Sequence, residues 1–200
     1  DLSMRLDPDI LMYGEIRDLA SAQAAFRGGM TGHLVLTTLH TNNAVAALQR
    51  LIDMGVDRHL VTDPALMTSV VNQSLLPVLC SHCRVPAREH LGQLNSALVQ
   101  HLRDLEAIDE TYLKGPGCPH CKGLGITGRT VVAETLLTDL EFMRVFNGQG
   151  ASAARRHWVK EMGGITKTAH TIIKLKQGLV DPRHAEMTVE IGRASCRERV

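Results

Sequence analysis

Aromatic residues are scarce in this chain, since only 3% of its 200 residues are Phe, Trp or Tyr. A hydrophobic core must therefore be aliphatic, built from Leu, Val, Ile, Met and Ala. An excess of charge of one sign is also lacking, because 22 Lys and Arg are balanced by 21 Asp and Glu. This balance argues against a protein that binds nucleic acid through general electrostatic attraction.

Long apolar runs are missing too. No stretch approaches the roughly 18 apolar residues that a membrane-spanning helix requires. Residues 1–9 contain three Asp and no apolar segment of the kind that signal peptides have. A hydrophobic content of 44% is still enough for a packed core, which argues against intrinsic disorder. The length fits one domain with or without an appendage. Because the chain starts at Asp1 and soon enters an apolar segment, we interpret it as a piece of a longer protein.

The C-terminal sequence EIGRASCRERV, residues 190–200, shows no helical or strand periodicity that continues what precedes it. It resembles a translated sequencing adapter, and we leave it out of the interpretation of fold and function. One of the five cysteines, Cys196, belongs to this segment. Four cysteines therefore remain for structural interpretation.

These four cysteines form two C-x-x-C pairs, in LCSHCR and GCPHCKGLG, with 34 residues between them. Two such turns can present four thiolates as a tetrahedral site, which is typical of structural zinc. A disulfide framework would need an oxidising compartment, and a redox dithiol normally uses a single pair. His82 and His120 lie within the pairs and offer alternative ligands, although four thiolates already complete the shell. The predicted zinc ligands are Cys80, Cys83, Cys118 and Cys121.

Short apolar segments alternate with a helical pattern in the first part of the chain. Residues 9–13 and 33–39 are typical of buried strands, and residues 18–30 between them are typical of a helix. This alternation predicts an α/β fold whose parallel sheet is covered on both faces.

Polar residues follow both predicted strands. Glu15 and Arg17 come after the first strand, and His40, Thr41 and Asn42 come after the second. Ligands of parallel sheets bind beyond the carboxyl ends of the strands, so these side chains should converge. An acid, an arginine and a histidine in that place suit phosphate chemistry, because the carboxylate can orient a water while the cations hold phosphate oxygens.

The second half of the chain is expected to be mainly helical. Helices are predicted for residues 43–55, 91–105, 139–146, 151–162 and 166–177, followed by a short one after Asp181-Pro182. Thr138 is the expected N-cap of the 139–146 helix, and residues 130–133 are expected to form a strand. The basic face of the 166–177 helix would suit a membrane or an acidic partner, although a solvated face is the more ordinary interpretation.

Two segments, DPDILMYGEIRD and TGHLVLTTLHTN, resemble the Walker B segment and the histidine box of the secretion ATPase superfamily, which powers type II secretion and type IV pilus assembly. The tetracysteine pair, followed by GLGITGRTVVAE, resembles the zinc motif of the assembly-type branch. The resemblance covers roughly residues 1–189. It implies a homo-hexameric motor that uses ATP and Mg²⁺, lies in the cytoplasm at the inner membrane and acts on an inner-membrane platform protein, without binding nucleic acid.

The resemblance also implies a domain organisation. Residues 1–79 would be the C-terminal half of a RecA-like P-loop NTPase core, residues 80–128 an inserted zinc-binding subdomain, and residues 129–189 a returning strand with C-terminal helices. The chain contains no G-x-x-x-x-G-K-[ST] motif, so the phosphate-binding loop is expected upstream and this stretch alone is expected to be inactive. VNQSLLPVLC stands where the family usually has an AQRL-type sequence, and in this respect the chain resembles the ATPases of conjugative thin pili.

The resemblance assigns roles to the polar residues. Glu15 matches the catalytic acid, Arg17 would bridge elements near the nucleotide, and His40 would sense the γ-phosphate. Thr41 and Asn42 would lie at the nucleotide or at a subunit contact. His33 precedes the second strand, roughly 20 Å from His40 if the chain is fully extended, so it would instead link sites between subunits.

Simpler interpretations stay open beside these roles. Glu15 could be a solvated acid before a helix whose better N-cap is Asp18. Arg17 could be a surface cation paired with Asp18, and each histidine could be structural. The chain as a whole could be a non-catalytic, zinc-stabilised interaction module that docks on a platform protein. A zinc-ribbon nucleic-acid binder is disfavoured by the neutral charge and the few aromatics.

Overall fold

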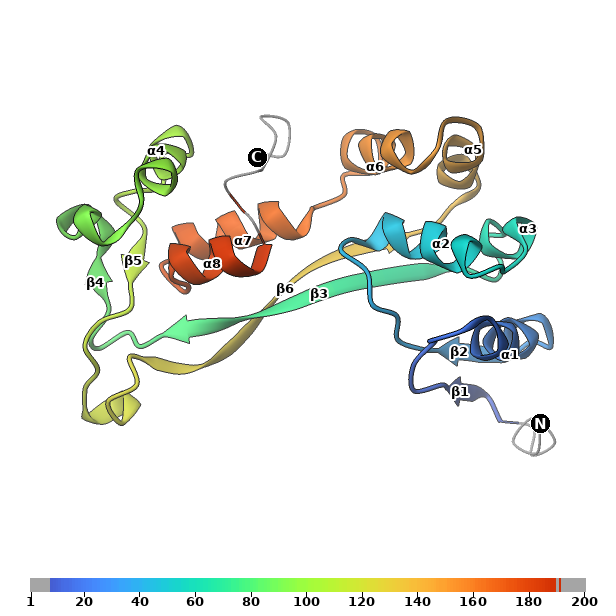
Figure 1. The fold of residues 1–200 in the computed structure, drawn as a ribbon, viewed down its shortest axis with the longest axis horizontal. Helices are drawn as coiled ribbons and strands as arrows, with labels where there is room; N and C mark the ends of the chain where they lie inside the picture. The colour runs from blue at the N-terminus through green and yellow to red at the C-terminus, as the bar shows by residue number, and fades with distance from the viewer. Residues whose placement is uncertain (1–7, 190, 192–200) are drawn as a thin grey trace. The chain divides into compact units, whose positions relative to one another are not determined.

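The computed structural model describes residues 8–189 and 191 (Figure 1). The chain folds into two compact units. The first comprises residues up to 72 together with 135–164, and the second comprises residues 73–134 together with those from 165 onward. Strands β3 (Ser69–Leu79) and β6 (Ile126–Leu137) pair with each other, and each passes from one unit into the other. The predicted domains 1–79, 80–128 and 129–189 were assigned from the family resemblance, and this assignment stays a prediction.

The first unit contains the predicted parallel strands. β1 (Ile10–Met12) pairs with β2 (Leu34–Leu36) in parallel, with Ile10 opposite Leu34, and α1 (Leu19–Met30) connects them. Both strands are shorter than predicted, because residues 13–16 and 36–38 continue beside each other through isolated hydrogen bonds rather than a regular ladder. The expected β-α-β arrangement is thus confirmed with shorter strands.

Only one face of this two-stranded sheet is covered among the described residues. Leu11 is buried, and a Cβ on Gly28 of α1 would lie 3.0 Å from Val35, so α1 sits directly on that face. The expectation of a sheet covered on both faces is not met, because no described element shields the apolar side chains of the other face. Those exposed side chains are Ile10, Met12, Leu34 and Leu36.

The remaining helices of the first unit are α2 (Ala44–Asp53), α3 (Arg58–Val61), α5 (Leu140–Gln149) and α6 (Ala151–Lys160). Their core is less purely aliphatic than the composition predicts. The few aromatic residues of the chain are concentrated there, because large rings bury the most apolar surface per side chain. The buried aromatic side chains are Phe26, Phe142, Phe146 and Trp158.

Helix starts follow local capping chemistry. The N-cap of α5 is Asp139, whose carboxylate accepts a hydrogen bond from the Phe142 N–H at 2.7 Å, so the predicted cap at Thr138 is wrong. The Thr138 hydroxyl donates instead to the Met67 carbonyl.

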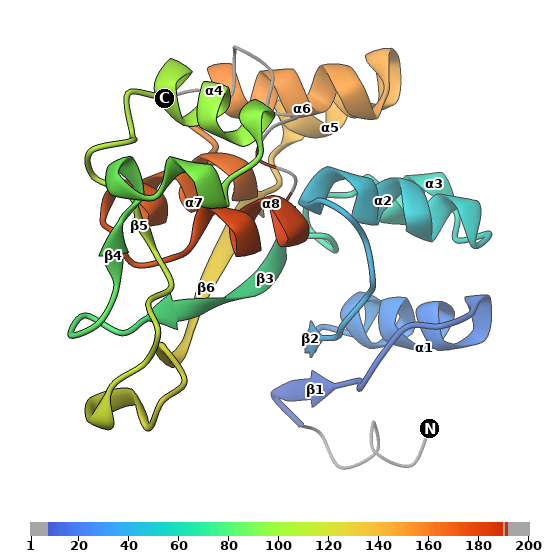
Figure 2. The same cartoon turned by 60° about the vertical axis from the view of Figure 1, so that its left-hand side comes forward.

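The second unit holds β4 (Val85–Pro86), β5 (Tyr112–Leu113), α4 (Ser96–Asp104), α7 (Lys167–Lys176) and α8 (Pro182–Val189). α7 and α8 lie side by side (Figure 2). The predicted 91–105 helix begins only at Ser96, because the Asn95 side chain accepts from the Leu98 N–H and caps it there, while residues 91–93 form a separate 3₁₀ turn.

The core of the second unit is aliphatic, as the composition predicts. It is formed by leucines of α4 with Ile172, Leu175, Val180 and Ala185. The predicted adapter segment, residues 190–200, lies outside the described residues except for Ile191, whose side chain is buried in this core. Within the described part of the chain, no helix combines the length and hydrophobicity that a bilayer span requires.

Candidate active site and tetracysteine centre

The carboxyl ends of β1 and β2 bring two distant chain segments together. The Ile16 N–H donates to the Thr38 carbonyl at 2.9 Å, and the Thr38 hydroxyl donates to the Gly14 carbonyl at 2.6 Å. Ile16 is itself buried in the core, 5% exposed, which fixes the start of this segment. Glu15 lies between Gly14 and Ile16, which are both hydrogen-bonded to Thr38, and His40 follows two residues after Thr38.

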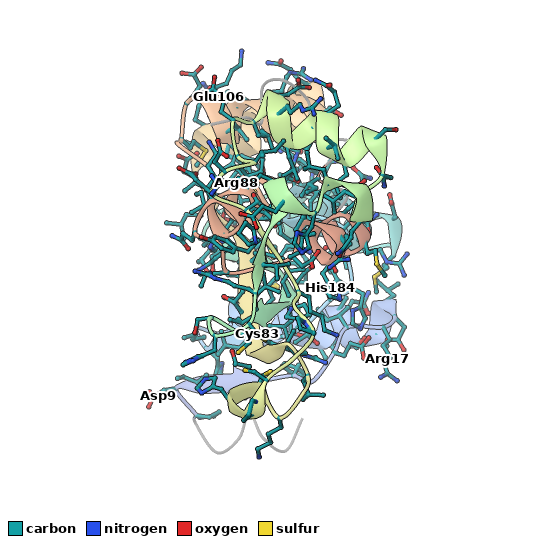
Figure 3. All side chains as sticks on the ribbon, turned by 90° about the vertical axis from the view of Figure 1, so that its left-hand side faces the viewer. Asp9, Arg17, Cys83, Arg88, Glu106 and His184 are labelled. Atoms are coloured by element: carbon teal, nitrogen blue, oxygen red, sulfur yellow. The ribbon has the colours of Figure 1, made fainter. Side chains whose placement is uncertain are left out.

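Glu15 is the centre of a three-residue cluster. Arg17 donates to Glu15 Oε2 through Nε and approaches the same oxygen through Nη2, both at 2.7 Å. The other oxygen, Oε1, lies 3.3 Å from His40 Nε2. The Glu15 side chain is 25% exposed, against 80% for Arg17 and 90% for His40. The acid is therefore the sheltered member, and the two basic side chains form its solvent-facing rim, with Arg17 pointing outward (Figure 3).

The surroundings of Glu15 favour its ionised form. The hydrogen bond from Arg17 lowers the pKa of the Glu15 carboxyl below its ordinary value of 4.5, with the charges of Arg17 and His40 adding to this and partial burial opposing it. The cluster therefore presents a carboxylate flanked by a guanidinium and an imidazole. Such a group can orient a water molecule or a metal-bound phosphate while the flanking groups contact phosphate oxygens.

The geometry bears on two simpler interpretations, that Arg17 pairs with Asp18 and that Glu15 is only a solvated acid before α1. Arg17 pairs with Glu15 rather than with Asp18. Asp18 is the N-cap of α1, where it forms a capping box with Ser21, so Glu15 is not needed for that purpose.

His33 lies apart from this cluster. Its Nδ1 is 3.0 Å from the Thr31 hydroxyl and 3.2 Å from the Gly28 carbonyl, in the turn that leads from α1 into β2. Within this chain the ring therefore has local structural partners.

The loop around Thr41 and Asn42 is held by side chains on both sides. The Thr41 hydroxyl donates to the Asn43 carbonyl, and Asn43 caps α2 by accepting from the Ala46 N–H. Asn72 of β3 donates through Nδ2 to the Thr41 carbonyl at 2.7 Å. Asn72 is not among the site residues predicted from the sequence. Asn72 stands next to Gln73 and Ser74 in the sequence, so no local signal distinguishes it as a site residue.

The four predicted cysteines form one compact cluster. Their ligand atoms all lie within 4.8 Å of one another, and three of the sulfur pairs are 3.8 Å apart. Four thiolates around a zinc ion at about 2.3 Å would be separated by about 3.8 Å in a regular tetrahedron. A disulfide would need sulfurs about 2.05 Å apart, so the cluster fits a metal and not a pair of bridges. Figure 3 marks Cys83 in these loops.

Backbone donors complete the sulfur environment. The N–H groups of Cys118 and Gly125 donate to Cys121 Sγ at 3.2 and 3.1 Å. Burial opposes ionisation of Cys121, but these donors lower the pKa of its thiol to about 6. Burial and the hydrogen bonds with neighbouring sulfurs raise the pKa of Cys83 to about 12. Four thiolates this close together would repel one another, and a cation at their centre would stabilise the ionised form of all four.

Glycines allow the two turns to approach closely. A Cβ on Gly115 would lie 1.6 Å from the Cys83 carbonyl oxygen, and one on Gly117 would lie 2.3 Å from the Gly123 carbonyl oxygen. Gly117 also has a φ of +100°, which glycine adopts readily. The rings of His82 and His120 stack outside the sulfur cluster with centroids 4.2 Å apart, and both residues are exposed.

Two ionic groups join the tetracysteine insert to the C-terminal helices within the second unit. Arg84, next to Cys83, donates to the Gly178 carbonyl. Asp181, fully buried, accepts from the Lys114 N–H at 2.7 Å and from Arg183 Nη2 at 2.6 Å.

The fold is similar to that of ATPases of known structure. The solved structure of the ATPase DotB from Legionella pneumophila superposes with a TM-score of 0.58, at 20% identity over 93% of this chain and 40% of that one. Residues 2–187 match the family described as "Type II/IV secretion system protein". The chain belongs to that family.

Two relatives illustrate the similarity. The type II secretion system protein HxcR of Pseudomonas aeruginosa is 38% identical over 80% of this chain. The type IV pilus assembly ATPase TfpB of Acinetobacter baylyi is also 38% identical over 80% of it. The chain spans 29% and 26% of the length of these two relatives.

Proposed function

We propose that this chain is the C-terminal part of the catalytic core of a motor ATPase that drives pilin assembly or protein secretion across the bacterial envelope. The observation that carries the proposal is the Glu15–Arg17–His40 cluster at the carboxyl ends of two parallel strands. Membership of the family and similarity to a type IV pilus assembly ATPase support the same conclusion.

Glu15 is the proposed catalytic acid. Its lowered pKa keeps it anionic at neutral pH, so it can orient the attacking water or bind a magnesium-coordinated phosphate. Bound ATP and Mg²⁺ supply the reacting phosphoryl group and its charge neutralisation. The anionic Glu15 and its basic neighbours fit such a ligand, but the phosphate cradle of a P-loop must come from residues outside this sequence.

His40 and Arg17 have distinct proposed roles. His40 is nearly fully exposed and contacts Glu15 through one nitrogen, so it can approach a γ-phosphate while still in contact with the acid. Arg17 keeps Glu15 charged and oriented, and its exposed guanidinium can reach an adjoining element or subunit. Thr41 and Asn42 would then lie beside the nucleotide, and His33 would serve a subunit contact.

Zinc is the proposed occupant of the tetracysteine cluster, with a structural role. Four thiolates leave no open coordination position for chemistry. A homo-hexamer at the cytoplasmic side of the inner membrane, acting on a platform protein, is the assembly that the family relationship favours. The tetracysteine insert is a candidate contact for that platform protein, which is also the function that remains if the chain acts as a non-catalytic module.

The decisive test uses the longer protein that carries a P-loop. Glu15→Gln should retain ATP binding and lose most turnover, by about 10²–10⁴-fold, because the amide keeps the shape but not the charge or basicity. Asp18→Asn, which changes the nearby helix cap, is the matched control and should retain turnover. Normal turnover in Glu15→Gln would contradict the assignment of the acid, and a longer protein without ATPase activity would favour the interaction module.

A further inference from the structure

His40 occupies a loop that is fixed to the rest of the first unit from both sides. On its N-terminal side, the Thr38 hydroxyl donates to the Gly14 carbonyl at 2.6 Å. On its C-terminal side, the Asn72 amide donates to the Thr41 carbonyl at 2.7 Å. Both bonds join residues more than twenty positions apart, so each constrains the loop against a separate segment. His40 lies between them.

The bond from Asn72 has the features of a specific positioning contact. Val70, two residues earlier in β3, packs against the core of the first unit, so the alternation of the strand turns Asn72 toward the same side. The amide oxygen Oδ1 is buried, and among the described residues it has no hydrogen-bond donor. Within the described part of the chain, the hydrogen bond from Nδ2 to the Thr41 carbonyl is the one polar contact of this side chain, so its orientation rests on that bond.

We propose that Asn72 is a positioning residue for the reaction, which acts by holding the 40–42 loop so that His40 Nε2 stays in contact with Glu15. The consequence for turnover rests on the proposed ATPase function, whereas the positioning itself does not.

Two substitutions distinguish whether Asn72 acts as a hydrogen-bond donor or only fills space. Asn72→Asp keeps the shape but places a carboxylate oxygen against the Thr41 carbonyl, whereas Asn72→Ala only removes the donor. If the donor matters, turnover should be highest in the wild type, lower in Asn72→Ala and lowest in Asn72→Asp. A space-filling role predicts that aspartate resembles the wild type.

The first measurement is turnover in the longer protein with a P-loop. Asn72→Ala should lower kcat by about 2- to 12-fold, the range expected for loss of one hydrogen bond, with little change in KM for ATP. Asn72→Asp should lower kcat further. In a His40→Ala background, Asn72→Ala should cause no additional loss, because the effect passes through His40. Asn147→Asp, the same chemical change at an exposed position of α5, is the control.

The second measurement needs no catalysis. In the 200-residue chain, NMR resonances of the His40 ring and the Thr41 amide should shift in both Asn72 variants and stay unchanged in Asn147→Asp. Unchanged His40 resonances, or an aspartate variant as active as the wild type, would overturn the inference. If the longer protein has no ATPase activity but the resonances shift as expected, the proposed function fails and the positioning role stands.

Discussion

Arg84 lies over the ring of Tyr112, with its guanidinium carbon 4.1 Å from the ring centroid. The same guanidinium donates to the Gly178 carbonyl at the end of α7. A Cβ on Gly178 would lie 2.7 Å from the Tyr112 ring, so the three groups are closely packed. The residue after a zinc ligand thereby connects the insert to the C-terminal helices of the second unit.

We expect Arg84→Met to destabilise the second unit by about 1–3 kcal/mol. Methionine keeps most of the apolar stem but loses the stacked cation and the charged donor. Urea unfolding of the zinc-loaded protein measures the difference. Arg88→Met is the matched control, because Arg88 is exposed and its ion pairs with Glu89 and Asp109 are 3.6 Å or longer. Equal stability of the two variants would show that Arg84 contributes only packing.

Asp181 should make stability depend on pH. Burial opposes its ionisation, but hydrogen bonds from Arg183 and from the Lys114 N–H lower the pKa of its carboxyl below the ordinary 3.8. A group with a lowered folded-state pKa stabilises the protein above its unfolded pKa, and this contribution is lost as the pH falls through the folded value. The contribution should therefore be complete at pH 5–7 and decline below about pH 4.

Asp181→Asn is expected to cost about 2–3 kcal/mol at pH 7, because the amide cannot replace a carboxylate that accepts several hydrogen bonds. The difference from the wild type should shrink below pH 4, when measured by denaturant unfolding across this range. Asp109→Asn, at an 80% exposed side chain, provides the comparison. A cost for Asp181→Asn that is constant from pH 7 to pH 3 would contradict the pKa argument.

The purified chain should bind one zinc ion through the tetracysteine cluster. Cys80→Ser should abolish stoichiometric binding and loosen the insert, because metal binding is coupled to folding. The sheet around Glu15 belongs to the other unit and should persist by circular dichroism and NMR. Cys196→Ser, which changes a cysteine that is not a predicted ligand, should bind zinc normally. Four freely reactive thiols in the native protein, or no metal by elemental analysis, would refute the site.

His40→Ala should reduce turnover in the longer protein and weaken its discrimination between ATP and ADP. The reason is that, in the role proposed for His40, only ATP would present a γ-phosphate to its ring. Paired measurements of the Kd for ATP and ADP test this directly. His33→Ala should leave the preference for ATP intact within one subunit, since His33 contacts Thr31 and Gly28 instead. Loss of the preference in His33→Ala alone would reverse the two assignments.

The candidate site was largely predictable because it follows general rules of local geometry. Parallel strands end at one edge, so Glu15 and His40 were expected to converge, and they lie 3.3 Å apart. Two C-x-x-C turns were likewise expected to meet, and their sulfurs do. The short length of β1 and β2 was less predictable. Residues 13–16 and 36–38 pair through isolated hydrogen bonds, and the apolar pattern of the sequence does not indicate where a regular ladder stops.

The long-range side-chain contacts were not predictable from the sequence. Asn72 and Thr41 are 31 positions apart, and no periodicity connects them. Strand β3 was also missed, because it contains Pro77, a residue that argues against a strand interior. The sequence indicates Asp181 only as the residue before the last helix, yet its carboxylate also accepts a hydrogen bond from a backbone N–H in the insert. Such contacts depend on tertiary packing and leave no local signature.

The close approach at Gly115 and Gly117 determines which mutations the insert can tolerate. In both cases the atom that a Cβ would strike belongs to the backbone, so no change of rotamer can relieve the clash. In a deep mutational scan scored for zinc retention, both positions should therefore reject every substitution. The exposed His120 beside them should accept most residues, because its ring lies outside the four-sulfur cluster. Substitutions in the second C-x-x-C turn should therefore be tolerated mainly at its exposed side chains.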